Sequence, residues 1–496
     1  MESDWTTLCD RNGEATGATS TLYRLDEVVD GSRPAALRTV SVPTRTRSRA
    51  GRGWVTRRDI GPLTIGLLVV AYSALWLIER PAGEPLGRHL GQLFGAESVL
   101  LLSIGLVLVS LLPWVESWFD GIDRAILWHR RTAATGTVLL VPHIALSSSP
   151  NPTPLGVVLA VAGLGGLSLL VVWAVLPRWR AITPRLLRRA VLAIARTAPA
   201  RLVRRLLGGY DHWRALHRLT GLFVGAGFVH GVLDATSFGS SPMLRWSYLV
   251  VGGLGLAAYG YRELLTPVLL ARHHYSVEAL ERLSDELTEV VLAPAGQPLD
   301  FTPGQFVMAA LPSNVGRNSH PFTISSGVGD PRVRLTIAAL GDHTTGLSQL
   351  LRPGMPAVIS DPAGRFDRRT ATRDQIWVAA GAGVAPFLSW ARSLDHDDTA
   401  ETDDIDFFYT TTGPAPFADE LRSIADRHPF MRLHVVDTSF GARLSPADLL
   451  AATGKPVDSV TVYLCGPAPM LRQFERALRR AGVPRGRLHH EYFNWR

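Results

Sequence analysis

The sequence predicts a multidomain membrane protein in three folded parts: a six-helix transmembrane bundle, an antiparallel β-barrel and an α/β domain with a parallel sheet. Three patterns support this fold class. Apolar segments concentrate in residues 1–265, strand-like alternation begins near residue 275, and a strand–loop–helix pattern follows residue 371. The predicted parts are a disordered basic tail at 1–58, the bundle at 59–266, the barrel at 272–368 and the α/β domain at 371–496.

The composition narrows the class of protein. Hydrophobic residues make up 46% of the chain, which is high for a soluble protein. Two cysteines, Cys9 and Cys465, exclude a disulfide framework or a zinc cluster. The net charge of +8 comes mostly from Arg on loops between apolar segments, which favours membrane orientation over nucleic-acid binding. The tail shows no signal-peptide pattern and is expected to be cytoplasmic.

Six segments approach the roughly 20 mostly apolar residues that a membrane-spanning helix needs. Nine arginines between residues 178 and 209, together with the Arg-rich run before the first segment, place both regions on the cytoplasmic side. A multi-pass protein of the plasma membrane is therefore expected, with its N-terminus and its C-terminal half in the cytoplasm. The predicted spans are 61–78, 98–115, 125–147, 154–177, 214–236 and 246–264.

Four histidines lie inside the third and fifth spans. His129 and His143 are fourteen residues apart, and His217 and His230 are thirteen apart. These two spans run parallel, so His129 with His217 lies near the cytoplasmic end and His143 with His230 near the outer end. The levels are separated by roughly 20 Å. Histidine is costly in a membrane, and pairs of neutral imidazoles are good axial haem ligands, so two stacked haems are predicted.

The two histidine spacings do not match on ideal helices. Thirteen residues leave the second side chain about 140° away from the first, so the fifth span must tilt, deform or place its haems on different faces. Gly221, Gly225 and Gly227 favour deformation. Pro142 is likewise expected to disturb the third span just before His143.

Motifs in the C-terminal half indicate binding of a dinucleotide-like cofactor. A turn at 303–307 precedes the sequence His320-Pro321-Phe322-Thr323. Further along, Gly346, Leu347 and Ser348 open an expected helix, whose N-terminal amides suit a pyrophosphate.

A second nucleotide motif combines Gly381, Ala382, Gly383, Val384 and Pro386 between a strand and a helix. About eighty residues later, Cys465-Gly466-Pro467 ends another apolar strand. Together the two pieces indicate a parallel sheet with a crevice at its strand ends. Cys465 alone favours a buried structural thiol. The aromatic Phe493 near the chain end is either a packing residue or a ring beside a flavin.

Taken in order, the paired histidines, the His320–Thr323 motif, the glycine loop and Cys465–Pro467 resemble the ferric reductase / NADPH oxidase superfamily over about residues 60–496. The resemblance implies two b-type haems, FAD and a nicotinamide cofactor, NADPH or NADH. It also implies that hydride passes to FAD, which then releases single electrons to the haems.

The resemblance assigns roles to individual residues. It implies that Phe322 and Thr323 lie against the isoalloxazine, that Gly346–Ser348 holds the FAD pyrophosphate, and that Glu491 and Phe493 lie near the nicotinamide. The candidate catalytic residues are Phe322, Cys465, Glu491 and Phe493.

Two positions depart from the pattern of the superfamily. Ser147 stands where animal NADPH oxidases tend to carry another histidine, which weakens the case for dedicated superoxide production. Many NADPH-using members have an Arg just after the strand that here is followed by Thr411, Thr412 and Gly413. Arg422 or Arg443 could bind the 2′-phosphate instead, so both NADH and NADPH remain candidate donors.

The predicted function is an oxidoreductase that transfers electrons across a lipid bilayer. Cytoplasmic NAD(P)H is the donor, and a small-molecule acceptor at the outer face, a ferric chelate or dioxygen, is reduced. One alternative is a membrane flavocytochrome that passes electrons to a quinone or a protein partner. The other is a transporter or sensor with an attached regulatory domain. No nucleic-acid partner is expected.

Overall fold

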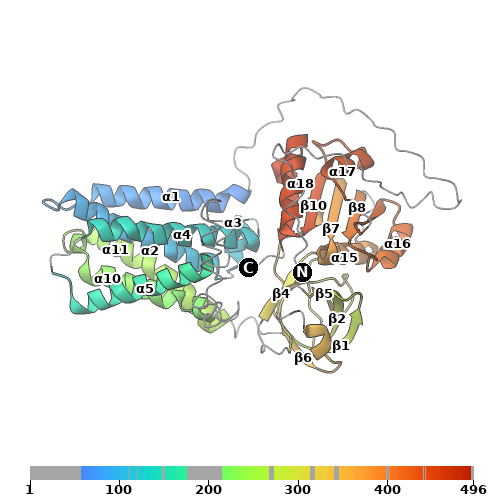
Figure 1. The fold of residues 1–496 in the computed structure, drawn as a ribbon, viewed down its shortest axis with the longest axis horizontal. Helices are drawn as coiled ribbons and strands as arrows, with labels where there is room; N and C mark the ends of the chain where they lie inside the picture. The colour runs from blue at the N-terminus through green and yellow to red at the C-terminus, as the bar shows by residue number, and fades with distance from the viewer. Residues whose placement is uncertain are drawn as a thin grey trace, which may run out of the picture. The chain divides into compact units, whose positions relative to one another are not determined.

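A computed structural model divides the chain into two compact units, within Gly53–Leu269 and Leu270–Arg496 (Figure 1). Residues 1–56 of the predicted tail and the Arg-rich connection at 178–209 lie outside the described residues. The structure describes 57–110, 112–119, 121–147, 151–175, 215–266, 273–312, 319–339, 344, 346–397, 400, 403–439, 441 and 443–492.

The first unit is helical, and its long helices lie side by side with roughly parallel axes (Figure 1). Helix α2 packs against α4 and α11, and α5 packs against α10. Short connections at the ends of the long helices include a 3₁₀ turn and a π turn. The elements are α1 (Arg57–Ile78), α2 (Leu86–Leu108), α3 (Pro113–Phe119), α4 (Ile122–Leu146), α5 (Pro154–Val175), α10 (Thr220–Asp234), η3 (Thr236–Gly239), α11 (Pro242–Gly260) and η4 (Tyr261–Leu265).

The second predicted span was placed wrongly. The helix begins at Leu86 rather than at residue 98, and a separate short helix, α3, follows it. The first turns of α2 contain His89 and Glu97, which lower the hydropathy of this segment, yet both side chains are buried inside the bundle. His89 bonds the Trp76 carbonyl through Nε2 at 2.7 Å, and Glu97 accepts from Ser73 Oγ at 2.7 Å.

Four described helices are long and apolar enough to cross a membrane: Asp59–Ile78, Leu86–Leu108, Pro154–Val171 and Ala215–Asp234. The six-span prediction is therefore not confirmed, although the described part of the first unit contains six long helices. Helix α4 carries Arg130 and Arg131 beside one of its histidines, and α11 has Arg245 in its first turn.

The second unit begins with a six-stranded antiparallel sheet in the order β4-β3-β6-β1-β2-β5. Ile324, which follows β4, pairs with Leu335 of β5 and thereby closes the sheet into a barrel. The predicted antiparallel sheet is confirmed. Its elements are β1 (His273–Arg282), β2 (Leu287–Pro294), β3 (Phe306–Ala310), β4 (Ser319–Thr323), β5 (Val333–Ala338), α14 (Leu347–Leu350) and β6 (Pro356–Ile359).

The chain then forms a five-stranded parallel sheet in the order β11-β10-β7-β8-β9. Alternate residues of β7 face opposite layers: Trp377 packs on the side of α15 and α16, and Val378 on the side of α17 and α18. The predicted parallel sheet is confirmed. Its elements are η5 (Arg368–Thr370), β7 (Asp374–Ala380), η6 (Gly381–Val384), α15 (Ala385–Arg392), η7 (Leu394–His396), β8 (Asp404–Thr411), α16 (Ala418–Arg427), β9 (Met431–Asp437), α17 (Pro446–Thr453), β10 (Thr461–Gly466), α18 (Ala468–Ala481), η9 (Arg485–Arg487) and β11 (Leu488–Tyr492).

A buried ionic network holds the starting ends of these strands together. The Asp406 carboxylate, which is almost fully buried, lies 2.7 Å from Arg432 Nη2, 2.9 Å from Lys455 Nζ and 3.0 Å from His434 Nε2. Burial alone would raise the pKa of Asp406, but these three hydrogen-bonding partners hold it well below its ordinary value. The network lies at the edge of the sheet opposite the predicted nucleotide motifs, so we assign it to stability.

Asp406→Asn should lower the free energy of unfolding by about 3 kcal/mol, because it leaves buried cations without their carboxylate. Denaturant titration measures this loss, and the KM for NAD(P)H should not change. The matched control is Asp395→Asn, whose half-exposed carboxylate pairs with His428 and Arg427 and which should cost less than about 0.5 kcal/mol. Equal losses in the two variants would contradict the assignment.

The stabilisation by Asp406 should depend on pH. The pKa of Asp406 is lower in the folded chain than its ordinary value of about 4, so the unfolded chain binds this proton more tightly. The stabilisation is therefore complete above pH about 4 and is lost as the pH falls further. The stability difference between wild type and Asp406→Asn should stay constant from pH about 7 to 5 and shrink at pH about 3.

Candidate functional site

The helical unit brings the four predicted histidines together as two pairs. The ring centres of His129 and His217 are 6.2 Å apart, and those of His143 and His230 are 6.3 Å apart. A metal–imidazole bond of about 2 Å places the ring centres of two opposed ligands about 6 Å apart. Both separations therefore fit one iron atom between each pair of rings. Among the described residues, no cluster of three or more His, Cys, Asp or Glu suggests another metal site.

Backbone carbonyls orient three of these rings. His129 Nδ1 lies 2.8 Å from the Gly105 carbonyl, His143 Nδ1 lies 2.9 Å from that of Gly91, and His230 Nδ1 lies 3.1 Å from that of Gly156. Because a carbonyl only accepts, each Nδ1 must carry the proton. The Nε2 lone pair of each ring is then the one available to a metal, as in known metal-bound histidines.

The fourth ring and one close helix contact complete this arrangement. His217 Nδ1 lies 3.4 Å from Thr220 Oγ1. At Gly95, a Cβ atom would come within 2.7 Å of His143 Nδ1, so the absence of a side chain in α2 lets the His143 ring lie against it. Hydrogen bonds from Nδ1 to backbone carbonyls are also the usual support of metal-bound histidines.

The mismatch in histidine spacing is accommodated by deformation just after His217. Residues 218–219 interrupt the helix, and Leu219 N bonds the Leu216 carbonyl at 2.9 Å in the tighter 3₁₀ manner. Tighter winding turns the chain further per residue, which is the direction that thirteen residues need in order to match fourteen. The predicted glycines are not the point of deformation, and α4 continues through Pro142 to Leu146.

The predicted flavin motif lies on β4 at the edge of the barrel sheet. His320, Pro321, Phe322 and Thr323 pair antiparallel with β3, where Phe322 faces Val307 in register. Phe322 and Thr323 are buried. A proline at this position is compatible with an edge strand, because it donates no ladder hydrogen bond.

The segment expected to hold a pyrophosphate forms a single short helical turn. Gly346 caps α14, which contains only Leu347–Leu350, and the Gln349 and Leu350 amides already bond the Gly346 carbonyl. Leu347 is buried in the barrel core. The predicted helix is present but short, and the side chain of Ser348 lies outside the described residues.

The two nucleotide motifs meet at the carboxyl edge of the parallel sheet. Gly381–Val384 follows β7, Pro386 opens α15, and Gly466-Pro467 follows β10. Strands β7 and β10 are neighbours in the sheet. From β7 the chain continues to β8 and β9 on one side, and from β10 it continues to β11 on the other side. The gap between β7 and β10 is therefore the switch point at which such sheets bind ligands. A Cβ atom at Gly383 would lie 2.6 Å from the Cys465 carbonyl carbon and 2.8 Å from Gly466 N.

Strand register places two of the four predicted catalytic residues, Cys465 and Glu491, next to each other. Cys465 pairs with Ala379 on one side and with Glu491 on the other. The Cys465 side chain is fully buried in the core on the α15 side, which agrees with a structural thiol. Phe493 lies outside the described residues, so its predicted role near the flavin stays a prediction.

Sequence reasoning missed two groups of residues. The carbonyls of Gly91 and Gly105, which orient His143 and His129, are fourteen residues apart like the histidines themselves, and this matched spacing was a usable signal. The second group is the pair Glu289 and Arg392, which joins the barrel to the parallel-sheet domain. These residues are 103 positions apart, so no local sequence spacing indicates their contact.

Comparison with known proteins addresses the second unit. Residues 272–375 match a family described as an FAD-binding domain. That part of the chain therefore corresponds to an FAD-binding domain.

Two curated relatives have reductase names. The chain is 31% identical over 205 residues to the ferredoxin reductase component of 3-ketosteroid-9-alpha-monooxygenase from Rhodococcus rhodochrous. That match covers 39% of this chain and 56% of the relative. The carnitine monooxygenase reductase subunit of Escherichia coli is 28% identical, with 44% of this chain and 67% of the relative covered. The chain thus spans little more than half of the Rhodococcus protein.

A solved structure of the flavohaem-like FAD/NAD binding domain of nitric oxide dioxygenase from Vibrio cholerae is also similar. It has 21% sequence identity and a TM-score of 0.40, and the match covers 45% of this chain and 98% of that one.

Proposed function

We propose that this protein is a membrane flavocytochrome that carries electrons from cytoplasmic NAD(P)H, through FAD and two b-type haems, to an acceptor at the outer face of the plasma membrane. Haem iron at each histidine level would accept and release one electron at a time. The acceptor class we favour is a ferric chelate or dioxygen.

The distance between the two rings within each histidine pair is the observation that supports the proposal. Ordinary histidines in helix contacts have no reason to oppose one another twice with ring centres 6.2 Å and 6.3 Å apart. Nor would they be expected to direct Nδ1 to backbone carbonyls in three cases of four. Iron held by two imidazoles has both axial positions filled, and its natural task is electron transfer rather than substrate binding.

The surface of the helical unit supports a position in the bilayer. Large apolar side chains that are mostly exposed lie on several of its helices, far beyond what a soluble surface usually shows. The long helices pack through buried apolar side chains and close glycine contacts and leave these residues outside. Examples are Leu67 and Val70 on α1, Val138 and Val141 on α4, Val158 and Val161 on α5, Leu222 on α10 and Leu254 on α11.

The environment of the outer pair bears on the acceptor. Ser147 Oγ donates to the His143 carbonyl at 2.6 Å and lies 3.1 Å from His143 Nδ1. The Ser147 hydroxyl is thus hydrogen-bonded to His143, the proposed haem ligand four residues earlier. This arrangement favours reduction by electron transfer over a dedicated oxygen site, so we place ferric chelates before dioxygen.

The decisive experiment uses the purified full chain, in oriented vesicles, with NADH or NADPH on the flavin side. We expect a low-spin b-type spectrum with two haems per chain that bleaches on addition of the nucleotide, and reduction of an impermeant ferric chelate on the opposite side. A purified, folded protein without haem would overturn the proposal.

A second candidate follows from the relatives, which are reductase components of oxygenase systems. In this case electrons would leave at the flavin to a cytoplasmic protein partner or a quinone, and the helical unit would serve as an anchor. Chelate reduction confined to the nucleotide side of the vesicles would favour this candidate.

A further inference from the structure

Helix α15 connects the nucleotide loop to the flavin barrel. It begins at Ala385, directly after the glycine loop, and ends at Arg392. Along the helix, Trp390 Nε1 donates to the Pro303 carbonyl of the barrel at 3.0 Å, and Ser389 Oγ donates to the Ser326 carbonyl at 2.7 Å. A helix of this length spans about 12 Å, so the loop and the barrel contact are the two ends of one rigid element.

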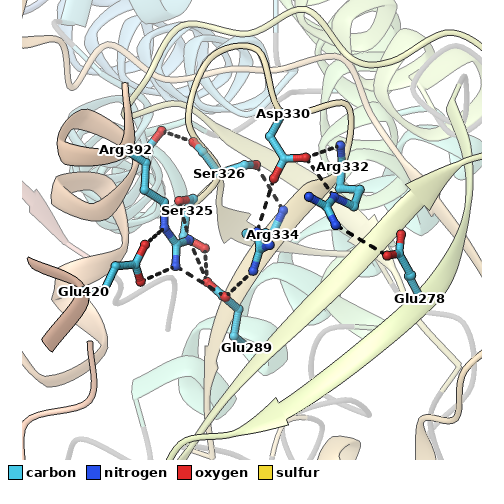
Figure 2. A network of polar contacts seen from close by, with 10 residues as sticks. Glu278, Glu289, Ser325, Ser326, Asp330, Arg332, Arg334, Arg392 and Glu420 are labelled. Carbon is cyan, nitrogen blue, oxygen red and sulfur yellow. Dashed lines mark hydrogen bonds and ion pairs between the residues drawn. The ribbon is translucent and has the colours of Figure 1, made fainter. Parts of the chain in front are cut away.

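Figure 2 shows the polar contacts of Arg392, the last residue of α15. Arg392 donates through Nη1 to Glu289 Oε1 of β2 at 2.9 Å and to the Ser325 carbonyl at 2.8 Å. It also holds Glu420 of α16 with two parallel bonds, Nε to Oε1 at 2.6 Å and Nη2 to Oε2 at 2.9 Å. Ser325 lies two residues after Thr323, the last residue of the flavin motif. One guanidinium therefore ties both helices to the segment that leaves the flavin strand.

The fit around Arg392 is close. A Cβ atom at Gly327 would lie 2.5 Å from the Arg392 carbonyl oxygen, so only glycine lets the two backbones approach here. Glu289 is almost fully buried and also receives Arg334 Nη1 at 3.0 Å and Ser325 Oγ at 3.0 Å. Its carboxylate is thus saturated by groups from both domains. Paired buried charges of this kind specify one arrangement, because any shift leaves a charge without its partner.

We propose that Arg392 is a positioning residue for hydride transfer: it fixes the nucleotide loop against the flavin barrel through Glu289, Glu420 and the Ser325 carbonyl. Reacting atoms must come within about 3.5 Å, and a misplacement of about 1 Å costs about a hundredfold in rate. The arginine touches neither predicted cofactor motif and acts through α15 and the segment after Thr323. The role concerns the flavin module alone and holds whichever acceptor takes the electrons.

The test compares Arg392→Gln, Arg392→Lys and Glu420→Gln in the full chain by anaerobic stopped-flow reduction of the flavin. In Arg392→Gln we expect flavin reduction to slow about a hundredfold, with a nucleotide Kd within about threefold of wild type. Arg392→Lys should recover part of the rate, since it keeps the charge but not the planar fork. Deuterium at the transferred position of the nucleotide should slow turnover more in the glutamine variants than in wild type.

The control lies next to Glu420 on the same helix. Asp419 is fully exposed and pairs only locally, with Arg422, so Asp419→Asn should keep the wild-type rate and isotope effect. Glu420→Gln keeps the Arg392–Glu289 pair, so it should fold with full FAD content even if Arg392→Gln does not. The proposal is overturned if Glu420→Gln retains both the wild-type rate and the wild-type isotope effect. It is also overturned if any loss of rate merely parallels a loss of bound FAD.

Discussion

Gly383→Ala should abolish NAD(P)H-dependent reduction of the flavin and leave FAD bound to the barrel. A Cβ atom at this position would lie 2.6 Å from the carbonyl carbon of Cys465, closer still to its oxygen, and 2.8 Å from Gly466 N. These are backbone atoms of β10, an interior strand of the sheet, and they cannot rotate away as a side chain would. The glycine loop must therefore move off the strand edge where the nucleotide is expected. We expect a rate at least about a hundredfold lower.

The same substitution should cost about 1–3 kcal/mol of stability, as overpacking usually does. Stopped-flow spectroscopy gives the rate, and the ratio of FAD to protein reports the barrel. Gly486→Ala is the matched control, because a Cβ atom there meets nothing within 4 Å and the residue lies in the same domain. If Gly383→Ala reduces flavin at the wild-type rate, the nucleotide does not bind at this junction of β7 and β10.

Most of the fold of the C-terminal half could be predicted from local sequence patterns. Alternation in β7 and the glycines after it predict a strand followed by a phosphate-binding turn, and the parallel sheet with its switch point follows from the repeated strand–helix order. The histidine pairs were predictable for a similar reason. A spacing of about fourteen residues returns a helix to nearly the same face, so His129 and His143 were expected to share one face of their helix.

Other parts depended on partners that are distant in the sequence. The start of α2 was missed because His89 and Glu97 are polar, and partners on other segments make their burial possible: the Trp76 carbonyl and Ser237 hydroxyl for His89, and the Ser73 hydroxyl for Glu97. Arg392 is an ordinary residue for the end of a helix, and its partner Glu289 lies 103 positions earlier. Hydropathy and spacing carry no information about such contacts.

His143→Ala should abolish reduction of an impermeant ferric chelate and spare reduction of the flavin by NAD(P)H. The substitution removes one ring of the pair whose centres are 6.3 Å apart, and the proposed outer haem would then lack an axial ligand. Haem content should fall from two per chain to about one. His129→Ala should also lose about one haem, but here the remaining outer level is cut off from the flavin, so its iron should no longer be reduced by the nucleotide.

The comparison that isolates the ligand role uses a fifth histidine of the same bundle. His89 is fully buried, and its Nε2 is engaged with the Trp76 carbonyl at 2.7 Å rather than directed at another imidazole. His89→Gln should therefore retain two haems per chain, even if the protein unfolds at a lower temperature. Pyridine haemochrome assays on the three variants measure the content directly. Equal loss of haem in His89→Gln and His143→Ala would mean that bundle stability, not axial ligation, controls haem binding. The proposed electron path through two haems would then have no support.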